Sequence, residues 1–343
     1  MSAKSTQSVK GAAAVTTRPL GRPVPAEGLD GTYSQSWFPL CLSTELPAGQ
    51  VLGVDFLGGR VAVFRCAAGG PARVVSGYCA HLGADLSVGH VEGEHLRCRY
   101  HGWRYDGAGT CASTGTGEPV PPRARLFSFP SRESHGIVWA FNGRRPLFDV
   151  PGLPVPPDDL LLRHTVLDEA PVDPWLVAAQ TMDVQHFLLQ HGFALDDGDD
   201  PNDAVTATAH SMGYPLRLTT PDGQRLDLRV EIHGTSVFRQ TGTLDGRWFC
   251  WLTALRSVRP GVSRPYFVLG ARRAEGGADP AADEAFLDRA MGVMMGMLAD
   301  DAPVLLTLHF RPGLLTRSDR ALGRYLEYVR RHPRAHPARE DIS

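Results

Sequence analysis

Two pairs of cysteine and histidine residues form the most informative pattern in this chain of 343 residues. Cys79 and His81 are separated by one residue, Cys98 and His101 by two, and sixteen residues lie between the pairs. Each pair offers one thiolate sulfur and one imidazole nitrogen, which are good ligands for borderline-soft metal ions. We therefore expect two short loops that bind metal together.

The mixed composition of these pairs favours two metal ions over one. A single tetrahedral zinc ion could use the same four donors, but zinc modules usually carry a CxxC pair and a separate pair of histidines. In a [2Fe-2S] cluster of the Rieske type, two cysteines hold one iron and two histidines hold the other. Since each loop supplies one ligand of each kind, the pattern predicts such a cluster on Cys79, His81, Cys98 and His101.

The segment around these pairs resembles the Rieske domain of the Rieske non-haem iron oxygenases. The family signature is CxH, sixteen residues, and CxxHGW, and here it runs from Cys79 to Trp103. The likeness continues in WFPLCLSTELPAGQ before the motif and in PPRARLFSFPSRESHGIVWAFNG after it, so it covers essentially Trp37 to Phe148. The resemblance implies that Trp103 packs over the cluster.

A second candidate site lies in the segment DVQHFLLQH, which contains Asp183, His186 and His191. Asp183 and His186 are three residues apart and would share one face of a helix. His186 and His191 are five residues apart, so on an unbroken helix they would point about 140° away from each other. We therefore expect the helix to loosen or bulge near residues 187 to 190 if both histidines hold one metal.

The family resemblance also implies roles for these residues. Its members carry DxxHxxxxH and a distant carboxylate that completes a 2-His-1-carboxylate triad for Fe(II). The family pattern D-x-P-[IV] falls on Asp301, and Asp300 is the alternative third ligand. The triad would then consist of His186, His191 and Asp301. Asp183 would not be a ligand but would bridge His186 and a Rieske histidine, here His101.

The pattern of strands and turns divides the chain into three parts: a tail at residues 1–34, an all-β domain at 35–148, and an α+β domain at 149–343. Residues 147–159 are rich in proline and glycine, as is typical of a linker. The tail is expected to be unstructured, although its acid-poor start can also mimic an organelle transit peptide. The resemblance makes the second domain a Rieske domain and the third a catalytic domain of the helix-grip (START-like) type, with an antiparallel sheet that carries the mononuclear iron site.

Three helices are predicted in the last part of the chain. The first begins at the N-cap Asp173 and ends before Gly192, the second covers residues 284–301, and the third follows the capping Ser318. Met291, Met294, Met295 and Leu298 share one face of the second helix. They are expected to be core residues or to line an adaptable apolar pocket.

The overall composition excludes several classes of protein. The chain has 35 basic and 37 acidic side chains, a net charge of −2, which argues against binding to nucleic acid or to an anionic membrane. It has no run of about 18 apolar residues to span a bilayer. Its six cysteines are too few for a disulfide scaffold and suit a reducing compartment, so the expected location is cytoplasmic.

The resemblance implies a monooxygenase built from one type of subunit, assembled as a head-to-tail homotrimer. It would use a [2Fe-2S] cluster, mononuclear Fe(II), O₂, and electrons from NAD(P)H through a separate reductase, with or without a ferredoxin. The expected reaction is hydroxylation of a C–H bond in a largely apolar, ring-containing small molecule. Desaturation, oxidative cyclisation, demethylation and N-oxygenation are alternatives, and a non-catalytic Rieske electron-transfer protein is the alternative class.

Overall fold

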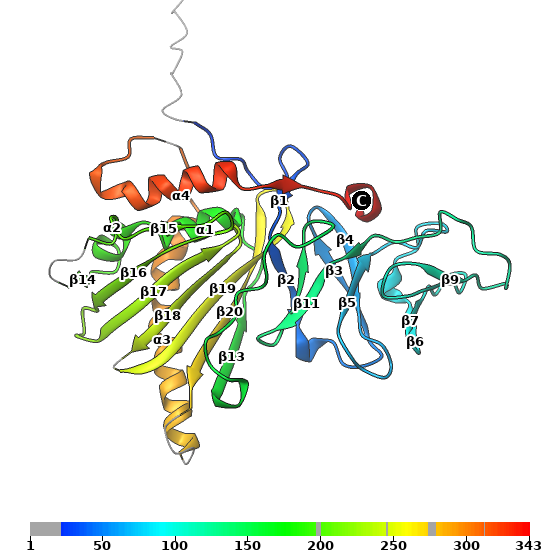
Figure 1. Cartoon of the computed structure of the whole chain (residues 1–343), viewed down its shortest axis with the longest axis horizontal. Coiled ribbons are helices and arrows are strands. Elements are labelled where there is room, and N and C mark those ends of the chain that lie inside the picture. The colour runs from blue at the N-terminus through cyan, green and yellow to red at the C-terminus, as the bar shows by residue number, and fades with distance from the viewer. Residues whose placement is uncertain (1–21, 197–199, 245, 274–278, 312) are drawn as a thin grey trace, which may run out of the picture.

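The computed structural model describes residues 22–196, 200–244, 246–273, 279–311 and 313–343. Two sheet-rich halves lie side by side along the longest axis of the molecule (Figure 1). The N-terminal half contains three small antiparallel sheets, and the C-terminal half contains one large antiparallel sheet with helices packed against it. The predicted α+β class is therefore confirmed.

The N-terminal half is built from short strands in the orders β10-β5-β4-β3, β11-β12-β2 and β6-β7-β8-β9. The strands are β2 (Trp37–Leu42), β3 (Val51–Phe56), β4 (Gly59–Phe64), β5 (Arg73–Ser76), β6 (His90–Glu92), β7 (His95–Arg97), β8 (Arg104–Tyr105), β9 (Cys111–Ser113), β10 (Ser128–Phe129), β11 (Ser131–Ser134) and β12 (Ile137–Phe141). Two single-turn 3₁₀ helices, Ser43–Glu45 and Leu86–Val88, join some of them.

The hairpin of β3 and β4 ties the two halves together. Its two turn residues, Leu57 and Gly58, have positive φ angles of 53° and 79°, as a tight hairpin turn between twisted strands requires. Their amides donate hydrogen bonds to the carbonyls of Ser257 and Val258, at 2.9 and 2.8 Å. The tip of this hairpin is thus held on the longest strand of the C-terminal sheet.

The C-terminal sheet has the order β13-β20-β19-β18-β17-β16-β14, and β15 pairs with β16. The runs RLDLRVEIHG, SVFRQTG, WFCWLTALRSV and RPYFVLGARR, whose composition and alternation predict strands of an antiparallel sheet, lie in β17 to β20. The bounds are β13 (Leu160–Val166), β14 (Ala194–Leu195), β15 (Thr206–Ala207), β16 (Ser211–Thr219), β17 (Arg225–His233), β18 (Val237–Leu244), β19 (Arg247–Arg259) and β20 (Val262–Arg272).

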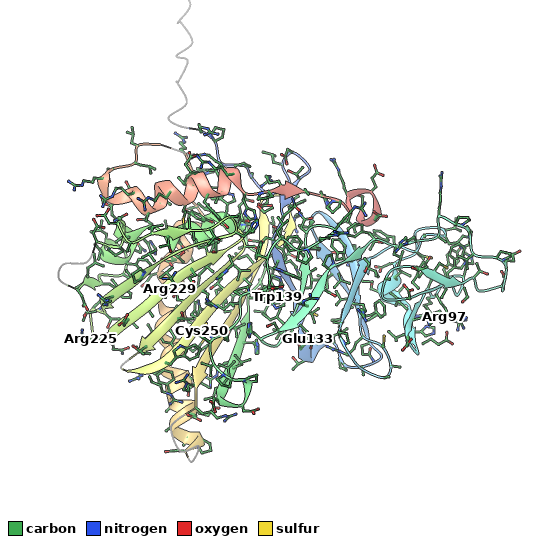
Figure 2. The ribbon with its side chains drawn as sticks, viewed as in Figure 1. Arg97, Glu133, Trp139, Arg225, Arg229 and Cys250 are labelled. Atoms are coloured by element: carbon green, nitrogen blue, oxygen red, sulfur yellow. The ribbon has the colours of Figure 1, made fainter. Side chains whose placement is uncertain are left out.

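Burial along these strands shows what each face of the sheet contacts. β17 alternates buried and more exposed residues, as a strand with one wet face does, whereas β19 is buried almost throughout. The second face of β19 packs against the N-terminal half, where Cys250 shares a core with Trp37 and Trp139. Figure 2 shows Trp139 at the boundary between the two halves and Cys250 on the adjoining sheet.

The helices are α1 (Pro174–Gln180), α2 (Val184–Leu189), α3 (Pro280–Leu305), α4 (Arg320–Arg331) and α5 (Arg339–Ile342). In Figure 1, α3 crosses behind the large sheet and α4 runs along its upper edge. The prediction of one helix from residue 174 to 191, loosened near residues 187 to 190, was wrong in the position of its break, because the chain leaves the helix at residues 181–183 and forms α1 and α2. Among the described residues, no helix is both long and apolar enough to cross a membrane.

The two ends of the described chain are interlocked. β1 (Tyr33–Ser34) pairs with β21 (Arg334–Ala335), and Ile342 of α5 joins the core of the N-terminal half. Residues 22–34, which were expected to be unstructured, are therefore packed. The reason is that buried Glu27 accepts hydrogen bonds from Ser34 and forms an ion pair with Arg334 at 3.2 Å. Residues 1–21 of the predicted tail lie outside the described residues.

Asn142, fully buried just after β12, forms hydrogen bonds with both ends of the described chain. Its side-chain amide donates to the carbonyls of Tyr33, Ser34 and Ala335, at 3.1, 3.1 and 2.8 Å. We expect Asn142→Ala to lower the free energy of unfolding by about 2 to 4 kcal/mol, because it leaves buried carbonyls unpaired. Chemical denaturation measures this change, and the exposed Thr116→Ala is the control. Equal stability of the two variants would contradict this role.

Candidate metal centres

The two cysteine and histidine pairs lie on two loops of the same shape. In each loop the cysteine carbonyl accepts a hydrogen bond from the glycine four residues later, Gly83 in one and Gly102 in the other, at 2.8 and 3.1 Å. Both glycines have φ angles above 70°, a conformation that other residues rarely adopt. The first loop follows β5 and the second joins β7 to β8, so neighbouring sheets present the loops to each other.

The four donors are arranged by type. Cys79 and Cys98 are buried, at 4% and 2% exposed, whereas His81 and His101 are exposed and their ring centroids lie 4.8 Å apart. Trp103 stacks on His81 at a centroid distance of 4.6 Å, which agrees with its expected place over the cluster. Two thiols inside and two imidazoles outside fit a [2Fe-2S] cluster with one cysteine-bound and one histidine-bound iron.

Tyr105 supports the buried side of this site, a role that the sequence analysis missed. Its hydroxyl lies 3.1 Å from the Cys79 sulfur and accepts a hydrogen bond from the backbone amide of Ala80. Burial raises the pKa of the Cys79 thiol, and the Tyr105 hydroxyl partly opposes this rise. Hydrogen bonds to cluster sulfurs tune the reduction potential of such sites. Its position in the run HGWRY, two residues after Trp103, is the signal that could have pointed to it.

His186, His191 and Asp301 form the second centre. The Nε2 atoms of the two histidines are 3.0 Å apart, and Asp301 Oδ1 lies 3.1 and 3.2 Å from them. Ligands that are about 2.1 Å from an ion and at right angles to each other lie about 3.0 Å apart, so the triangle has the size expected for one face of a metal's coordination shell. The three residues are the group among the described residues that could hold a single ion.

The electrostatics of Asp301 suit a metal ligand. Burial acts to raise the pKa of this carboxyl group, but the adjacent His186 and His191 outweigh burial and lower the pKa below its usual value. Asp301 is therefore ionised at neutral pH. Its Oδ1 atom is buried and has no hydrogen-bond partner of suitable geometry, so its lone pair is free to bind a cation.

The end of α2 makes the convergence of the two histidines possible. α2 ends at Leu189, and Gly192 adopts a positive φ of 66°, so the chain turns before it continues to Phe193. His191 therefore lies beyond the helix and can point back towards His186. The expected loosening near residues 187 to 190 corresponds to this helix end.

The break before α2 places Asp183 at a helix terminus. Asp183 is the N-cap of α2, and its carboxylate accepts a hydrogen bond from the backbone amide of His186 at 3.2 Å. The expectation that it shares a helix face with His186 was wrong, although the two residues remain neighbours. Thr181 stabilises the break, because its carbonyl accepts a hydrogen bond from the Tyr214 hydroxyl.

Asp300, the alternative third ligand, lies outside the triangle. Its Oδ2 atom is 3.8 Å from Nδ1 of His191, on the side of that ring opposite Nε2, and the side chain is mostly exposed. This distance is too long for a hydrogen bond, and Nδ1 of His191 has no hydrogen-bond partner among the described residues. The structure thus brings Asp301 to the two Nε2 atoms and leaves Asp300 behind His191.

A narrow apolar cavity opens onto the triangle. It is lined by His186, His191, Asp301, four aromatic residues, and a set of aliphatic and polar residues: Phe187, Phe238, Trp251, Phe267, Val177, Gln180, Thr181, Gln240, Thr253, Met294, Met297 and Leu298. The free volume of the cavity is about 60 Å³, which is room for a few water molecules. A ring-sized ligand would therefore displace flexible side chains such as Met294 and Met297.

The two centres are far apart within one chain. The strands β6, β7 and β9 beside the cysteine and histidine loops lie at one end of the molecule, and α2 lies at the opposite end (Figure 1). His101 and Asp183, which the resemblance pairs, therefore do not meet within a single chain. A contact between them requires a second copy.

The N-terminal half matches a known domain family. The profile of the Rieske [2Fe-2S] domain matches residues 36–130, which include both loops. Residues 36–130 are a Rieske domain. The [2Fe-2S] cluster is the cofactor that such a domain carries.

Three curated relatives match 32% to 40% of this chain. The chain is 35% identical over 131 residues to cholesterol 7-desaturase nvd 1 of Ciona intestinalis, over 37% of this chain and 28% of the relative. It is 37% identical over 142 residues to 4beta-methylsterol monooxygenase of Methylococcus capsulatus, over 40% and 37%. It is 34% identical over 110 residues to the oxygenase component of 3-ketosteroid-9-alpha-monooxygenase of Rhodococcus rhodochrous, over 32% and 28%. The chain thus spans about a third of the length of these relatives.

Solved structures match both halves. NdmB of Pseudomonas putida CBB5 superimposes with a TM-score of 0.69 at 21% identity, over 86% of this chain and 90% of that one. Dicamba monooxygenase bound to dicamba superimposes with a TM-score of 0.65 at 19% identity, over 88% and 98%. At this level of identity the likeness shows the fold, which is a Rieske domain followed by the large antiparallel sheet domain of such oxygenases.

We expect His186→Ala and Asp301→Ala each to lose one iron per chain while the visible absorption of the Rieske domain survives, because the two centres share no ligand. Cys98→Ser should do the reverse and abolish that absorption. Iron analysis and absorption spectra of the purified variants measure both effects. Asp300→Asn is the matched control and should keep its iron. Loss of iron in Asp300→Asn but not in Asp301→Ala would move the third ligand by one residue.

Proposed function

We propose that this protein is an O₂-dependent oxygenase of the monooxygenase type, which hydroxylates a C–H bond of a largely apolar, ring-containing small molecule. The observation that carries this proposal is the triangle of His186, His191 and Asp301 at the end of an apolar cavity, in the same chain as a Rieske domain. An electron carrier needs no such second centre. The names of the curated relatives, which include monooxygenases and a desaturase, support the same reaction class.

Both metal groups have residues that fit them. When bound, the [2Fe-2S] cluster would supply single electrons and a mononuclear Fe(II) would supply the reduction of O₂. Cys79, His81, Cys98 and His101 would hold the cluster. His186, His191 and Asp301 would hold Fe(II) from one side and leave its other positions open.

The residues around the triangle have separate tasks in this proposal. The aromatic walls of the cavity, including Phe187, Phe238 and Phe267, hold the apolar substrate and exclude water from the iron site. Desaturation is the second candidate reaction, because it uses the same site and because one relative is named a cholesterol desaturase.

We also propose that electrons come from NAD(P)H through a separate reductase, with or without a ferredoxin. One relative is named the oxygenase component of its enzyme, which supports a division of labour between chains. All six cysteines are unpaired in the structure, which suits a reducing compartment such as the cytoplasm.

The transfer between the two centres would pass from one chain to the next in a head-to-tail homotrimer. The exposure of His81 and His101 supports this arrangement, since both rings can contact a neighbour. Leu189 on α2, 81% exposed beside the second centre, offers an apolar contact on the receiving side. In this assembly Asp183 would bridge His101 of one chain and His186 of the next. The division into domains 35–148 and 149–343 would place the cluster and the mononuclear iron in different domains of each chain.

Turnover with a reductase tests the reaction class. We expect iron-loaded protein, given NADH, a reductase, O₂ and a panel of cholesterol, 3-ketosteroids and smaller ring ketones, to consume O₂ and yield a product with one additional oxygen atom. Loss of two hydrogen atoms would identify a desaturase. Iron analysis should find three irons per chain, and His186→Ala is the inactive control. Two irons per chain with no product from the unmutated protein would instead identify an electron carrier.

The bridge is tested by Asp183→Asn. Asparagine is also a good N-cap, so the variant keeps the start of α2 and removes only the charge that would orient both imidazoles. We expect both metal centres to persist while reoxidation of the pre-reduced cluster by O₂ and substrate slows by about 10- to 100-fold. Stopped-flow absorption follows this reoxidation in a single turnover. Asp173→Asn, at the N-cap position of α1, is the control, and an unchanged rate in Asp183→Asn would exclude the bridging role.

A further inference from the structure

One wall of the iron-site cavity is formed by the large sheet. The register pairs Phe238 on β18 with Thr253 on β19 and pairs Thr253 with Phe267 on β20. Gln240 pairs with Trp251 in the next row on the same face. Directly opposed residues of an antiparallel sheet project to the same side, so these five side chains form one surface, and all of them line the cavity.

Two polar groups in this surface have no partner. Thr253 is fully buried and Gln240 is 4% exposed, yet neither the Thr253 hydroxyl nor the Gln240 Oε1 atom makes a hydrogen bond. Thr181 also lines the cavity, but unlike Thr253 its hydroxyl has a partner, because it donates a hydrogen bond to the carbonyl of Ala178 at 2.8 Å. Buried polar groups are nearly always paired in folded proteins, and the exceptions call for a ligand or another specific reason.

The two unpaired groups are placed to bind one ligand together. Gln240 and Thr253 are diagonal neighbours across β18 and β19, a relationship that sets their Cβ atoms roughly 7 Å apart in an ordinary sheet. An amide and a hydroxyl can each donate or accept a hydrogen bond. Between them they can satisfy a hydroxyl, a ketone or an amide group, whereas neither neutralises a charge.

The charges around the cavity favour an uncharged ligand. The lining residues that the structure describes include no lysine or arginine, and the ionisable ones are His186, His191 and Asp301 of the triangle. A carboxylate or phosphate held by Gln240 and Thr253 would have no lysine or arginine to pair with, and burial of an unpaired charge is strongly unfavourable. The remaining walls are aromatic or aliphatic, which suits a ring system.

We propose that Gln240 and Thr253 are substrate-binding residues that select a ring compound carrying one uncharged polar group, a hydroxyl, ketone or amide, and that exclude ring carboxylates. This inference rests on the proposed function and narrows its substrate class. The polar group anchors one end of the ring system on the sheet, and the apolar remainder lies among Phe187, Met294 and Leu298 near the triangle.

A matched set of three ligands tests the selection without turnover. The ligands are β-tetralone, tetralin, and the carboxylic acid of tetralin substituted at the same ring position. Dissociation constants are measured on the oxidised, iron-loaded protein by quenching of tryptophan fluorescence, to which Trp251 in the cavity contributes, and by calorimetry. We expect the ketone to bind roughly 3- to 10-fold more tightly than the hydrocarbon, and the acid to bind most weakly.

Variants assign the effect to the two residues. Thr253→Val and Gln240→Met preserve side-chain size, and each should weaken ketone binding roughly 3- to 10-fold while leaving hydrocarbon binding unchanged. Thr253→Ser, which keeps the hydroxyl, should retain the preference for the ketone. Thr235→Val is the matched control, because the Thr235 hydroxyl is also buried and unpaired but lies outside the cavity lining. Iron content and the Rieske spectrum verify that each variant is folded.

Three results with the unmutated protein would overturn the proposal: equal affinity for the ketone and the hydrocarbon, tightest binding of the acid, or no measurable binding of any of the three ligands. With the variants, equal weakening of ketone and hydrocarbon binding in both Thr253→Val and Gln240→Met would also overturn it. None of these binding results bears on the oxygenase assignment, which is tested separately by iron analysis and O₂-dependent product formation. The failure of the two proposals can therefore be distinguished.

Discussion

The C-terminal half depends on one constraint, which is that three atoms with lone pairs must lie close to one another. Nε2 of His186, Nε2 of His191 and Oδ1 of Asp301 lie 3.0 to 3.2 Å apart in a largely buried site. Such atoms approach this closely when a proton or a cation lies between them. A divalent cation at their centre would be bound by all three lone pairs. The helix ends, the sheet wall and the cavity all serve this arrangement.

The position of Asp301 depends on how α3 is attached to the sheet. Near the start of the helix, Arg163 on β13 pairs with Glu284 and Asp288 at 2.5 Å each. These ion pairs are partly exposed and contribute modestly to stability, so the buried face of α3, including Phe286, supplies most of the attachment. Asp301 lies 13 residues beyond Asp288, about 20 Å along the helix axis. A long helix therefore carries the carboxylate from one edge of the sheet to the histidines.

The sequence by itself determined the parts of this protein in which chemistry depends on local spacing. The two loops with Cys79 and Cys98 are short, and each donor pair spans three or four residues, so residue type and spacing were enough to predict a Rieske cluster. Strands β17 to β20 were also predictable, because alternation and β-branched content report a sheet directly. His186, His191 and Asp301 could be named as a site only through the family resemblance. Asp301 is more than one hundred residues from the two histidines, and such a separation gives no local signal.

Only the tertiary structure decided the features that arise from contacts distant in sequence. At the break between α1 and α2, the N-cap Asp183 is a local feature, whereas the hydrogen bond from the Tyr214 hydroxyl to the Thr181 carbonyl comes from a separate strand and is not visible in the local helix pattern. The packing of residues 22–34 depends on Arg334, at the other end of the chain. The unpaired state of Gln240 and Thr253 is likewise invisible in the sequence. Whether a polar side chain is satisfied depends on every neighbour that folding brings to it, and spacing along the chain does not determine those neighbours.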